Sequence, residues 1–319
     1  FNTELGLPLT GFRLREEDEI AVLEMGISDF GEMTRLAKIA KPQTCVITNI
    51  GTCHLENLGD RDGVLKAKTE IFQYLKPEGH IVLNGDDDKL STIEEYKGIR
   101  PVFFGLDKNR DVYADQIVSR GLKGVSCRIH LGEEDFSVLV PMPGIHMIYN
   151  ALAAAAVGRI YGLTLDEIKK GIESLESISG RFHMIETDRL LIVDDCYNAN
   201  PMSMKASLDV LHDGAGRRVA ILGDMGELGE NEAALHREVG AHAASCGIDA
   251  CVCAGSLARH IAEAAREKNP EFPVFYEETR ESLLKNLSRY VQKGDTVLVK
   301  ASHFMKFEEV VKALEEMQC

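Results

Sequence analysis

The sequence contains no tryptophan, no internal repeat and no low-complexity tract. It has no apolar run near the ~18–20 residues that a transmembrane helix needs, and no signal-peptide pattern opens it. The net charge of −15 argues against a nucleic-acid-binding surface, because such surfaces are basic. Anionic substrates are not excluded, since local groups of Lys, Arg and backbone N–H can still bind phosphate. A hydrophobic content of 45% over 319 residues indicates a globular protein of about two domains.

Two motif classes are also missing. The eight cysteines include no CxxC pair, so neither a zinc knuckle nor a redox motif is indicated. Cys251 and Cys253 lie in the apolar run "DACVCAG", where they are expected to be small buried hydrophobic residues. This cysteine usage fits the reducing cytosol, so we expect a cytoplasmic protein. No G-x-G-x-x-G follows a predicted strand, which argues against a dinucleotide-dependent dehydrogenase.

The first part of the chain alternates short apolar runs with helical patterns. We expect strands at 19–26, 44–50 and 79–86, with helices at 31–40 and 61–75. This alternation indicates parallel βαβ units. Residues 100–144 have alternating character and tight turns, which favours an antiparallel meander. Helices are predicted at 146–162 and at 164–175, where Thr164 suits an N-cap.

A second α/β pattern begins around "ESISGRFHMIE", which predicts a domain boundary near Ser177 and domains at 1–177 and 178–319. The second domain repeats strand and helix patterns to its C-terminal helix, so we expect a mostly parallel, Rossmann-like sheet. In such sheets ligands lie at the carboxyl ends of the strands. The polar residues expected at strand ends are Glu24, Asn49, Asp194, Asp195, Asp224 and Lys300.

The stretch "HLENLGDRDGVLKAKTEIF" from His54 to Phe72 holds two lysines two residues apart. Residues at that spacing on a helix point away from each other, so only one lysine can be on the solvent side. Lys68 lies in the apolar stripe, three residues after Leu65 and four before Phe72. Lys66 falls on the opposite face. The pattern therefore predicts that Lys68 points inward.

A buried lysine must be paired, deprotonated or chemically modified. One interpretation is a lysine that snorkels to a carboxylate or phosphate at the helix edge. The other is a lysine carbamylated by CO2, which becomes an anionic oxygen ligand for a hard cation. Glu24 lies at the end of one predicted strand and His54 follows another, so both should project from the same sheet rim toward the same crevice. Together these groups would make a mixed oxygen and nitrogen site for Mg²⁺ or Mn²⁺.

The second domain has two polar strand ends. In "VDDCYNANP" two aspartates end a buried strand and Pro201 begins a helix. The carboxylates could bind ribose hydroxyls or a metal, or Asp195 to Ala199 could be a capped turn. In "VLVKASHF", Lys300 and Ser302 combine a cation, a hydroxyl and a helix N-terminus, which is anion-binding chemistry. Arg181 could bridge the domains through a phosphate, or could be an exposed linker arginine.

Taken together these stretches resemble the Mur ligases, the ATP-dependent amide-forming enzymes of peptidoglycan precursor synthesis, and among them the branch that adds D-alanyl-D-alanine. The resemblance runs the length of the chain, and "DDCYNANP" followed by "LGDMGELG" separates this branch from relatives that add other amino acids. It implies an α/β protein with a middle ATPase-type domain, truncated at its N-terminus, and a Rossmann-like C-terminal domain. Further matching stretches are "TNIGTCHLENLGD", "KAKTEIF", "LNGDDD", "PGIHMIYNALAAAA" and "DTVLVKAS".

The resemblance also implies roles for single residues. Lys68 matches the family's carbamylated lysine, and Glu24 and His54 match Mg²⁺ ligands. Two residues depart from the pattern: Met147 stands where the family often has Asn, and His303 replaces an Arg, which weakens any fixed positive charge. The other matches are Asn150 and His146 beside adenine, Arg181 and Asp195 as nucleotide contacts, and Asn198, Asn200, Lys300 and Ser302 at the rim where dipeptide and acyl phosphate meet.

The implied reaction joins UDP-MurNAc-tripeptide to D-Ala-D-Ala through an acyl phosphate, with ATP and Mg²⁺, in a cytoplasmic monomer. His54, Lys68 and Lys300 would carry the catalysis. The family's phosphate-binding loop and UDP-sugar-binding domain would precede Phe1, so we expect a truncated ligase that is inactive alone. Two alternatives remain open. One is another Mur-type or folylpolyglutamate-type ligase, and the other is a non-catalytic fragment that binds a nucleotide or a partner.

Overall fold

The computed structural model describes residues 2–317, and the chain forms two compact units. The first unit comprises Phe1–Gln116, Cys127–Val138 and Tyr149–Lys170. The second comprises Ile117–Ser126, Leu139–Ile148 and Gly171–Cys319. Both contain helices and strands, as predicted. No helix within residues 2–317 is long and apolar enough to cross a membrane.

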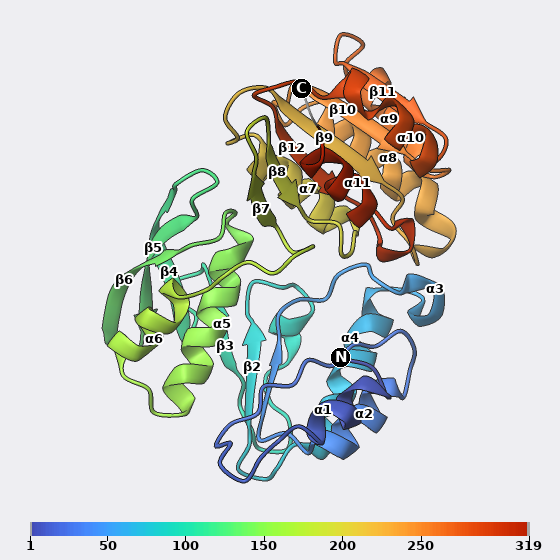
Figure 1. Cartoon of the computed structure of the whole chain (residues 1–319). Helices are drawn as coiled ribbons and strands as arrows, with labels where there is room; N and C mark the ends of the chain where they lie inside the picture. The colour runs from blue at the N-terminus through green and yellow to red at the C-terminus, as the bar shows by residue number, and fades with distance from the viewer. Residues whose placement is uncertain (1, 318–319) are drawn as a thin grey trace. The chain divides into compact units, whose positions relative to one another are not determined.

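The first sheet has six strands in sequence order (Figure 1). Neighbours from β1 to β4 pair in parallel. A two-residue turn joins β5 to β6, and so short a connection makes that pair antiparallel. The antiparallel meander predicted for residues 100–144 is therefore wrong for β3 and β4, which pair in parallel, and holds for the pair of β5 with β6. The strands are β1 (Thr44–Ile47), β2 (His80–Asn84), β3 (Val102–Gly105), β4 (Val112–Ser119), β5 (Val125–Leu131) and β6 (Glu134–Val140).

The helices of this part follow the predicted positions with one change. The pattern predicted a single helix at 61–75, but α4 (Arg61–Thr69) continues as the 3₁₀ helix η1 (Glu70–Tyr74). The carboxylate of Glu70 accepts hydrogen bonds from the backbone N–H groups of Gly31 and Thr34, and so caps α2 (Glu32–Ala40) from another element. The others are α1 (Gly6–Gly11), α3 (Leu55–Leu58), η2 (Leu90–Thr92), α5 (His146–Ile160) and α6 (Leu165–Glu173).

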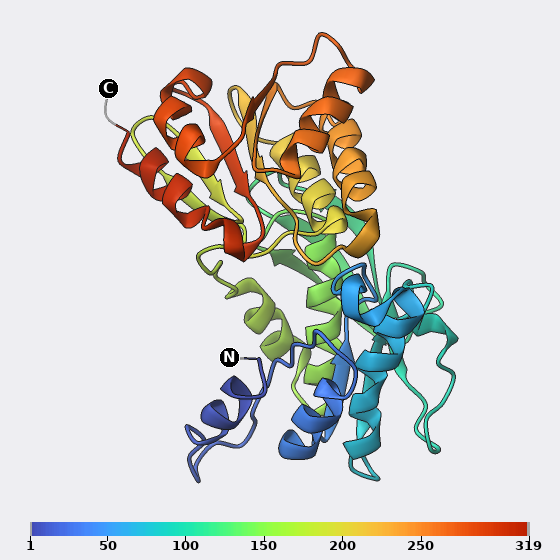
Figure 2. The ribbon, with the colours of Figure 1, turned by 90° about the vertical axis from the view of Figure 1, so that its right-hand side faces the viewer.

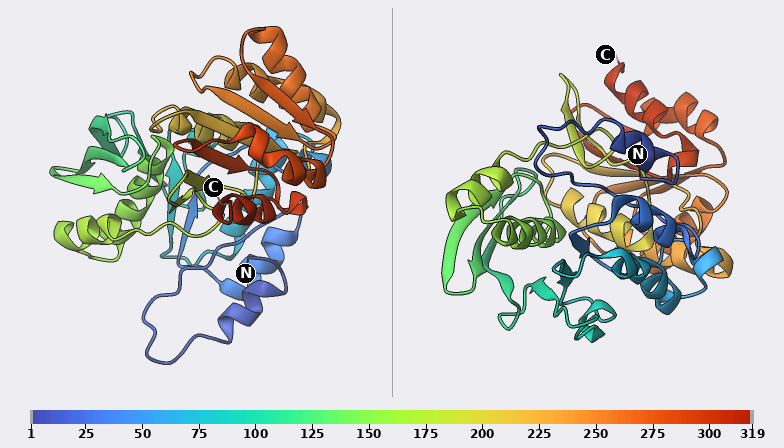
Figure 3. Two further views of the ribbon diagram at one scale, coloured as in Figure 1. Left: turned by 45° about the horizontal axis from the view of Figure 1, so that its top comes forward. Right: turned by 90° about the horizontal axis from the view of Figure 1, so that it is seen from below.

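Helices α5 and α6 lie beside strands β4 to β6 (Figure 3). Thr164 caps α6 as predicted, since its hydroxyl accepts the N–H of Glu167 at 3.3 Å. The Glu167 carboxylate in turn accepts the N–H of Thr164 at 2.8 Å, which completes a capping box. The start of this short helix is therefore satisfied by its own residues.

The predicted strand at 19–26 is wrong. These residues form no strand, and Ile20 and Val22 are exposed to 57% and 93%. At the end of the segment the backbone N–H of Gly26 donates to the carbonyl of Asn2 at 2.8 Å. An apolar run becomes a strand only where a neighbouring strand supplies hydrogen-bond partners. The sequence pattern carried the hydrophobicity of a strand but could not show whether a partner lies beside it.

The second sheet is mixed, with strand order β11-β10-β9-β12-β8-β7. All its pairs are parallel except the edge pair of β7 with β8, which is antiparallel. Strand β7 was not predicted, whereas the other five strands were. They are β7 (His183–Glu186), β8 (Leu191–Asp194), β9 (Arg218–Gly223), β10 (Ala250–Ala254), β11 (Val274–Glu277) and β12 (Thr296–Lys300).

Helices α7 to α11 cover the two faces of this sheet (Figure 2). Side chains alternate between the faces along each strand, so Cys251 and Cys253 pack on one face and Val252 on the other. The first core contains residues of α7 (Pro201–Leu211), α8 (Glu232–Ala243) and α9 (Ala258–Lys268). The second contains residues of α10 (Arg280–Tyr290) and α11 (Glu308–Glu315). Short 3₁₀ turns are η3 (Gly229–Asn231) and η4 (His303–Met305).

The cysteines behave as predicted. Those of the described part are free, and Cys251 and Cys253 are fully buried in β10. Their sulfur atoms lie 3.6 Å apart on the same face of the strand. Cys319 lies outside the described residues.

Candidate active site

The predicted site residues fall into two groups, one in each unit. The first group is Glu24, His54, Lys68 and Asn150. The second group is His146, Arg181, Asp195, Asn198, Asn200, Lys300 and Ser302.

Lys68 points inward from α4, as the helical stripe predicted. Its Nζ donates to the carbonyl of Asn49 at 2.9 Å, and the side chain is largely covered. Lys66 is exposed instead, with its ammonium 5.4 Å from the centre of the Phe30 ring. Burial lowers the pKa of Lys68, and the nearby Cys53 and Asp87 oppose this only in part. A larger fraction of Lys68 is therefore neutral than for a solvated lysine.

Three side chains hold the loop that follows β1. Besides the bond from Lys68, Asp87 Oδ2 accepts the N–H of Ile50 at 2.8 Å and Arg61 Nε donates to the carbonyl of Ile50 at 2.9 Å. The loop ends at His54, whose backbone is left-handed at φ 58° and ψ 29°. Neither Asp87 nor Arg61 was singled out from the sequence. The signal was "LNGDDD", which follows β2 at the same sheet rim.

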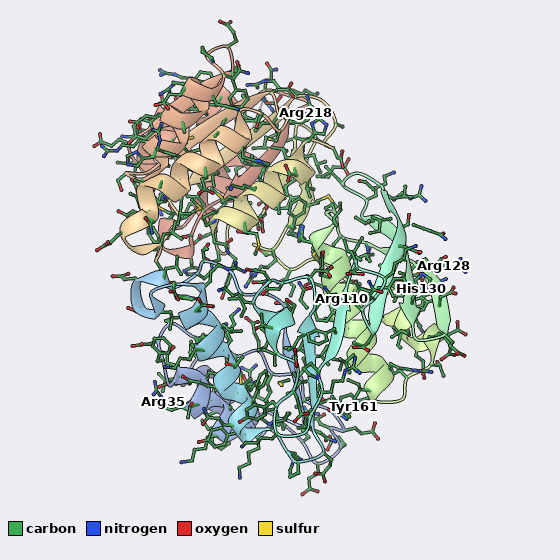
Figure 4. All side chains as sticks on the ribbon, turned by 180° about the vertical axis from the view of Figure 1, so that it is seen from behind. Arg35, Arg110, Arg128, His130, Tyr161 and Arg218 are labelled. Atoms are coloured by element: carbon green, nitrogen blue, oxygen red, sulfur yellow. The ribbon has the colours of Figure 1, made fainter. Side chains whose placement is uncertain are left out.

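The neighbouring Asp86 holds two further side chains at this rim. Its carboxylate accepts hydrogen bonds from Arg110 Nε at 3.0 Å and from the Tyr149 hydroxyl at 3.2 Å (Arg110 is labelled in Figure 4). Burial and the Asp86 carboxylate raise the pKa of Tyr149 to about 12. Asn150 follows Tyr149 on α5 with an exposed side chain. The fold therefore fixes Tyr149, the residue beside the exposed Asn150.

Glu24 is not shown beside His54 and Lys68. It is exposed in the extended segment 19–26, and its Oε1 accepts a hydrogen bond from Asn2 Nδ2 at 3.0 Å. Within the described residues no group of three or more His, Cys, Asp or Glu side chains is arranged to hold a metal ion. The ligand set of Glu24, His54 and Lys68 thus stays a prediction.

In the second unit Lys300 ends β12 and is only 2% exposed. Its Nζ donates to Asp195 Oδ2 at 2.6 Å and to the carbonyl of Asn198 at 3.1 Å. Asp195 Oδ2 also accepts the hydroxyl of Ser207 at 2.7 Å, and Oδ1 accepts the N–H of Phe182 at 3.2 Å. The predicted strand-end cation is therefore an internal partner of the Asp195 loop.

The other polar groups of "VDDCYNANP" also bind their own backbone. Asp194 Oδ2 accepts the N–H of Gly180 at 2.7 Å and the hydroxyl of Ser179 at 3.1 Å. Asn200 caps α7 by accepting the N–H of Ser203 at 2.9 Å. Asn198 remains exposed, although its Oδ1 accepts the adjacent N–H of Ala199 at 2.8 Å. Within Asp195 to Ala199, where a capped turn was one interpretation, the side chains of Asp195 and Asn198 both accept backbone N–H groups.

Arg181 is exposed and ordered by stacking. Its guanidinium carbon lies 4.1 Å from the centre of the Tyr197 ring. The same ring meets the edge of His303, with the ring centres 5.7 Å apart. The surrounding protein atoms lower the pKa of His146, although the residue is exposed; Asp195 opposes this shift and Lys300 adds to it. Tyr197 lies within the motif "VDDCYNANP", but the sequence did not predict it as a site residue.

Ser302 joins the β12 loop to the "LGDMGELG" loop that follows β9. Its hydroxyl accepts the N–H of Gly226 at 2.9 Å and donates to the carbonyl of Ala199 at 3.4 Å. In that loop Asp224 accepts the N–H groups of Leu257 and Ala258 at 3.0 and 2.7 Å, and so caps α9. The strand-end residue Asp224 therefore has a structural role.

His236 is a buried histidine that holds the same loop. Its Nε2 accepts the N–H of Met225 at 2.9 Å, so Nδ1 carries the proton and donates to the carbonyl of Glu232 at 2.7 Å. Burial lowers the pKa of His236, and its neighbouring acceptors and carboxylates oppose this only in part. The folded protein thus keeps His236 neutral.

Because folding disfavours protonation of His236, we expect the free energy of unfolding to decrease as the pH is lowered. Below pH ~6.5 the unfolded chain binds a proton on this imidazole that the folded chain does not, so protonation favours unfolding. Relative to a His236→Gln variant, which keeps an acceptor but does not titrate, the wild type should lose up to ~1.4 kcal/mol per pH unit as pH falls below ~6.5. Urea unfolding of both proteins between pH 5 and 8 measures this. A difference that stays constant across that range would contradict it.

Comparison with known proteins gives the class. Residues 1–158 match the family described as "Mur ligase middle domain", and residues 180–303 match "Mur ligase, glutamate ligase domain". The two matches follow the order of the two sheets along the chain. They define a Mur ligase, as the sequence motifs predicted.

Individual relatives narrow the class. The UDP-N-acetylmuramoyl-tripeptide–D-alanyl-D-alanine ligase of Bacillus subtilis is 38% identical over 99% of this chain and 68% of its own length. A crystal structure of MurF from Acinetobacter baumannii aligns with a TM-score of 0.90 at 32% identity, covering 99% of this chain and 69% of that one. MurF from Thermotoga maritima in complex with ADP aligns at 0.85 and 31%, covering 99% and 71%. The chain belongs to this D-alanyl-D-alanine ligase family.

Proposed function

We propose that this chain is part of an ATP-dependent ligase that joins UDP-MurNAc-tripeptide to D-Ala-D-Ala in peptidoglycan precursor synthesis. The observation that carries the proposal is the 38% identity with a relative of that name over 99% of the chain. The Thermotoga relative is a complex with ADP, which supports ATP as the phosphoryl donor. We place the reaction in the cytoplasm, with one copy of the chain per active site.

The reaction has two bond-forming steps. In the first, a terminal carboxylate oxygen of the tripeptide bonds to the γ-phosphorus of ATP while the bond to ADP breaks. In the second, the amine of D-Ala-D-Ala bonds to the acyl carbon, phosphate leaves and the amine loses a proton. Because two anions meet in the first step, positive charge and exclusion of water are what the protein must supply.

Mg²⁺ is the proposed metal, with Glu24, His54 and a carbamylated Lys68 as its ligands. The chemistry of Lys68 supports this assignment, because carbamylation requires a neutral amine and burial lowers the pKa of this one. Lys68 also contacts the carbonyl of Asn49, near the start of the loop that ends at His54. When bound, the cation would neutralise charge on the transferring phosphoryl group.

The remaining contacts are assigned by chemistry and exposure. Asn150 and His146 are proposed for the adenine, and the stacked guanidinium of Arg181 is proposed for a nucleotide anion. Asn198 offers an exposed amide to the dipeptide. Asp195, Asn200 and Ser302 would shape the loop that carries Asn198, since their polar atoms bind neighbouring backbone or side chains.

A ligation assay tests the proposal. The full-length protein that carries this chain should consume ATP and incorporate D-Ala-D-Ala when supplied with UDP-MurNAc-tripeptide and Mg²⁺, with product detected by mass spectrometry. L-Lys and L-Glu serve as competing acceptors, and preference for either would overturn the assignment. The 319-residue chain assayed in parallel tests the expectation that it is inactive alone. Robust turnover by that chain would contradict the expectation.

A further inference from the structure

Lys300 occupies an unusual position for a cation meant to meet substrate. It is 2% exposed at the end of β12, where the strand is buried along its whole length. An ammonium group has three donors and no acceptor. Lys300 directs them to Asp195 Oδ2 at 2.6 Å, the carbonyl of Asn198 at 3.1 Å and the carbonyl of Asp195 at 3.5 Å. Its hydrogen-bonding capacity is therefore directed into one loop of the protein.

The network that starts at Lys300 reaches two segments beyond the loop 195–200. Through Asp195 Oδ2 it meets Ser207 on α7, and through Oδ1 it meets the backbone N–H of Phe182, next to Arg181. The same loop is tied to the β12 end by the Ser302 hydroxyl. One buried ammonium thus neutralises the carboxylate that joins β12, α7 and the segment around residue 181.

The loop held in this way presents the exposed polar groups of the rim. Asn198 is exposed, and Lys300 holds its carbonyl. Tyr197 is 45% exposed and carries the guanidinium of Arg181 on its ring. A displacement of about 1 Å in such contact groups can cost ~10²-fold in rate or affinity. For dipeptide binding, the position of the loop therefore matters more than the charge of the Lys300 ammonium.

We propose that Lys300 is a positioning residue, which sets the loop 195–200 for D-Ala-D-Ala and does not touch the reacting groups. The inference rests on the proposed function, and it refines the sequence-based expectation that Lys300 is itself catalytic. Removing the ammonium leaves the covered Asp195 carboxylate without its cation, so the loop should loosen. Binding of the dipeptide should suffer, whereas the chemistry at saturating dipeptide should not.

The first test separates KM from kcat in a Lys300→Met variant. We expect KM for D-Ala-D-Ala to rise about tenfold while kcat changes by less than about threefold. Lys293→Met, which removes an exposed lysine of the same unit, is the matched control and should leave both constants unchanged. A fall in kcat of more than about 100-fold at saturating dipeptide would overturn the proposal, because it would mean that Lys300 acts in the transition state.

A double-mutant cycle tests whether Lys300 acts through Asp195. If it does, Lys300→Met combined with Asp195→Asn should raise KM for the dipeptide no further than the worse single variant. Multiplied effects would overturn the proposal. Should Lys300→Met fail to fold, Ser207→Ala removes another bond to the same carboxylate and should raise the same KM about threefold. An unchanged KM in that variant would count against the network.

Hydrogen exchange tests the inference without any substrate. In the 319-residue chain, backbone amides at 195–203 should exchange at least about tenfold faster in Lys300→Met than in wild type or Lys293→Met. Unchanged protection there would overturn the positioning role. If the Lys300→Met variant shows the expected faster exchange but the ligation assay fails, the result would instead count against the proposed function.

Discussion

A Lys68→Ala variant is expected to lose about 10²–10³-fold in kcat/KM for ligation, the largest effect on activity that we predict. Lys68 is the inward lysine of α4. Burial lowers its pKa, which increases the fraction of neutral amine that can react with CO2. The resulting carbamate would supply anionic oxygens next to the held loop that ends at His54. Removing it deletes a proposed metal ligand, and acetate should restore part of the activity by supplying a carboxylate in the vacated space.

The alternative for Lys68 is a simple cation that snorkels to the helix edge. Lys68→Arg separates the two, because arginine keeps the charge but cannot be carbamylated. We expect Lys68→Arg to be as impaired as Lys68→Ala, whereas Lys66→Ala on the exposed face should behave like wild type. Incorporation of ¹³CO2, followed by carbon NMR, reports the carbamate directly. An active Lys68→Arg variant with no ¹³C signal at Lys68 would sink the carbamate assignment.

The direction of Lys68 could be predicted from the sequence because helix periodicity is a local property. The stripe through Leu65 and Phe72 determines which of the two lysines faces the core. The second sheet was predicted for a similar reason, since each of its parallel strands is an unbroken apolar run. The failure at 19–26 has the opposite cause. Whether a run pairs depends on a neighbour that can lie anywhere in the chain, and periodicity does not contain that information.

The chemistry of the strand ends could be predicted only by residue type. "VDDCYNANP" indicated carboxylates at a rim, but the roles of Asp194 and Asn200 follow from backbone N–H groups near them in space. Asp224 shows the same limit, because it accepts the N–H of Ala258, 34 residues further along the chain. Polar residues at a strand end can serve a ligand or the turn itself, and only the three-dimensional partners distinguish the two.

The largest predicted loss of stability comes from adding a single methyl group between α8 and α9. A Cβ at Gly240 would lie 2.1 Å from the carbonyl oxygen of Ile261, which is backbone and cannot rotate away. The helices would have to separate, so Gly240→Ala should lower the free energy of unfolding by about 3 kcal/mol. For the second unit this corresponds to a fall in Tm of roughly 6–12 °C.

Gly171→Ala is the matched control for this change. Gly171 is also helical, but a Cβ there meets nothing within 4 Å, so alanine should raise stability by about 0.5–1 kcal/mol through the unfolded state. Thermal unfolding followed by circular dichroism should therefore shift in opposite directions for the two variants. Equal shifts would mean that α8 and α9 can separate freely. Because α8 carries His236 and α9 begins at the Asp224 cap, forced separation should also disturb the loop that contacts Ser302. We therefore expect Gly240→Ala to lose ligation activity at temperatures where it is still folded.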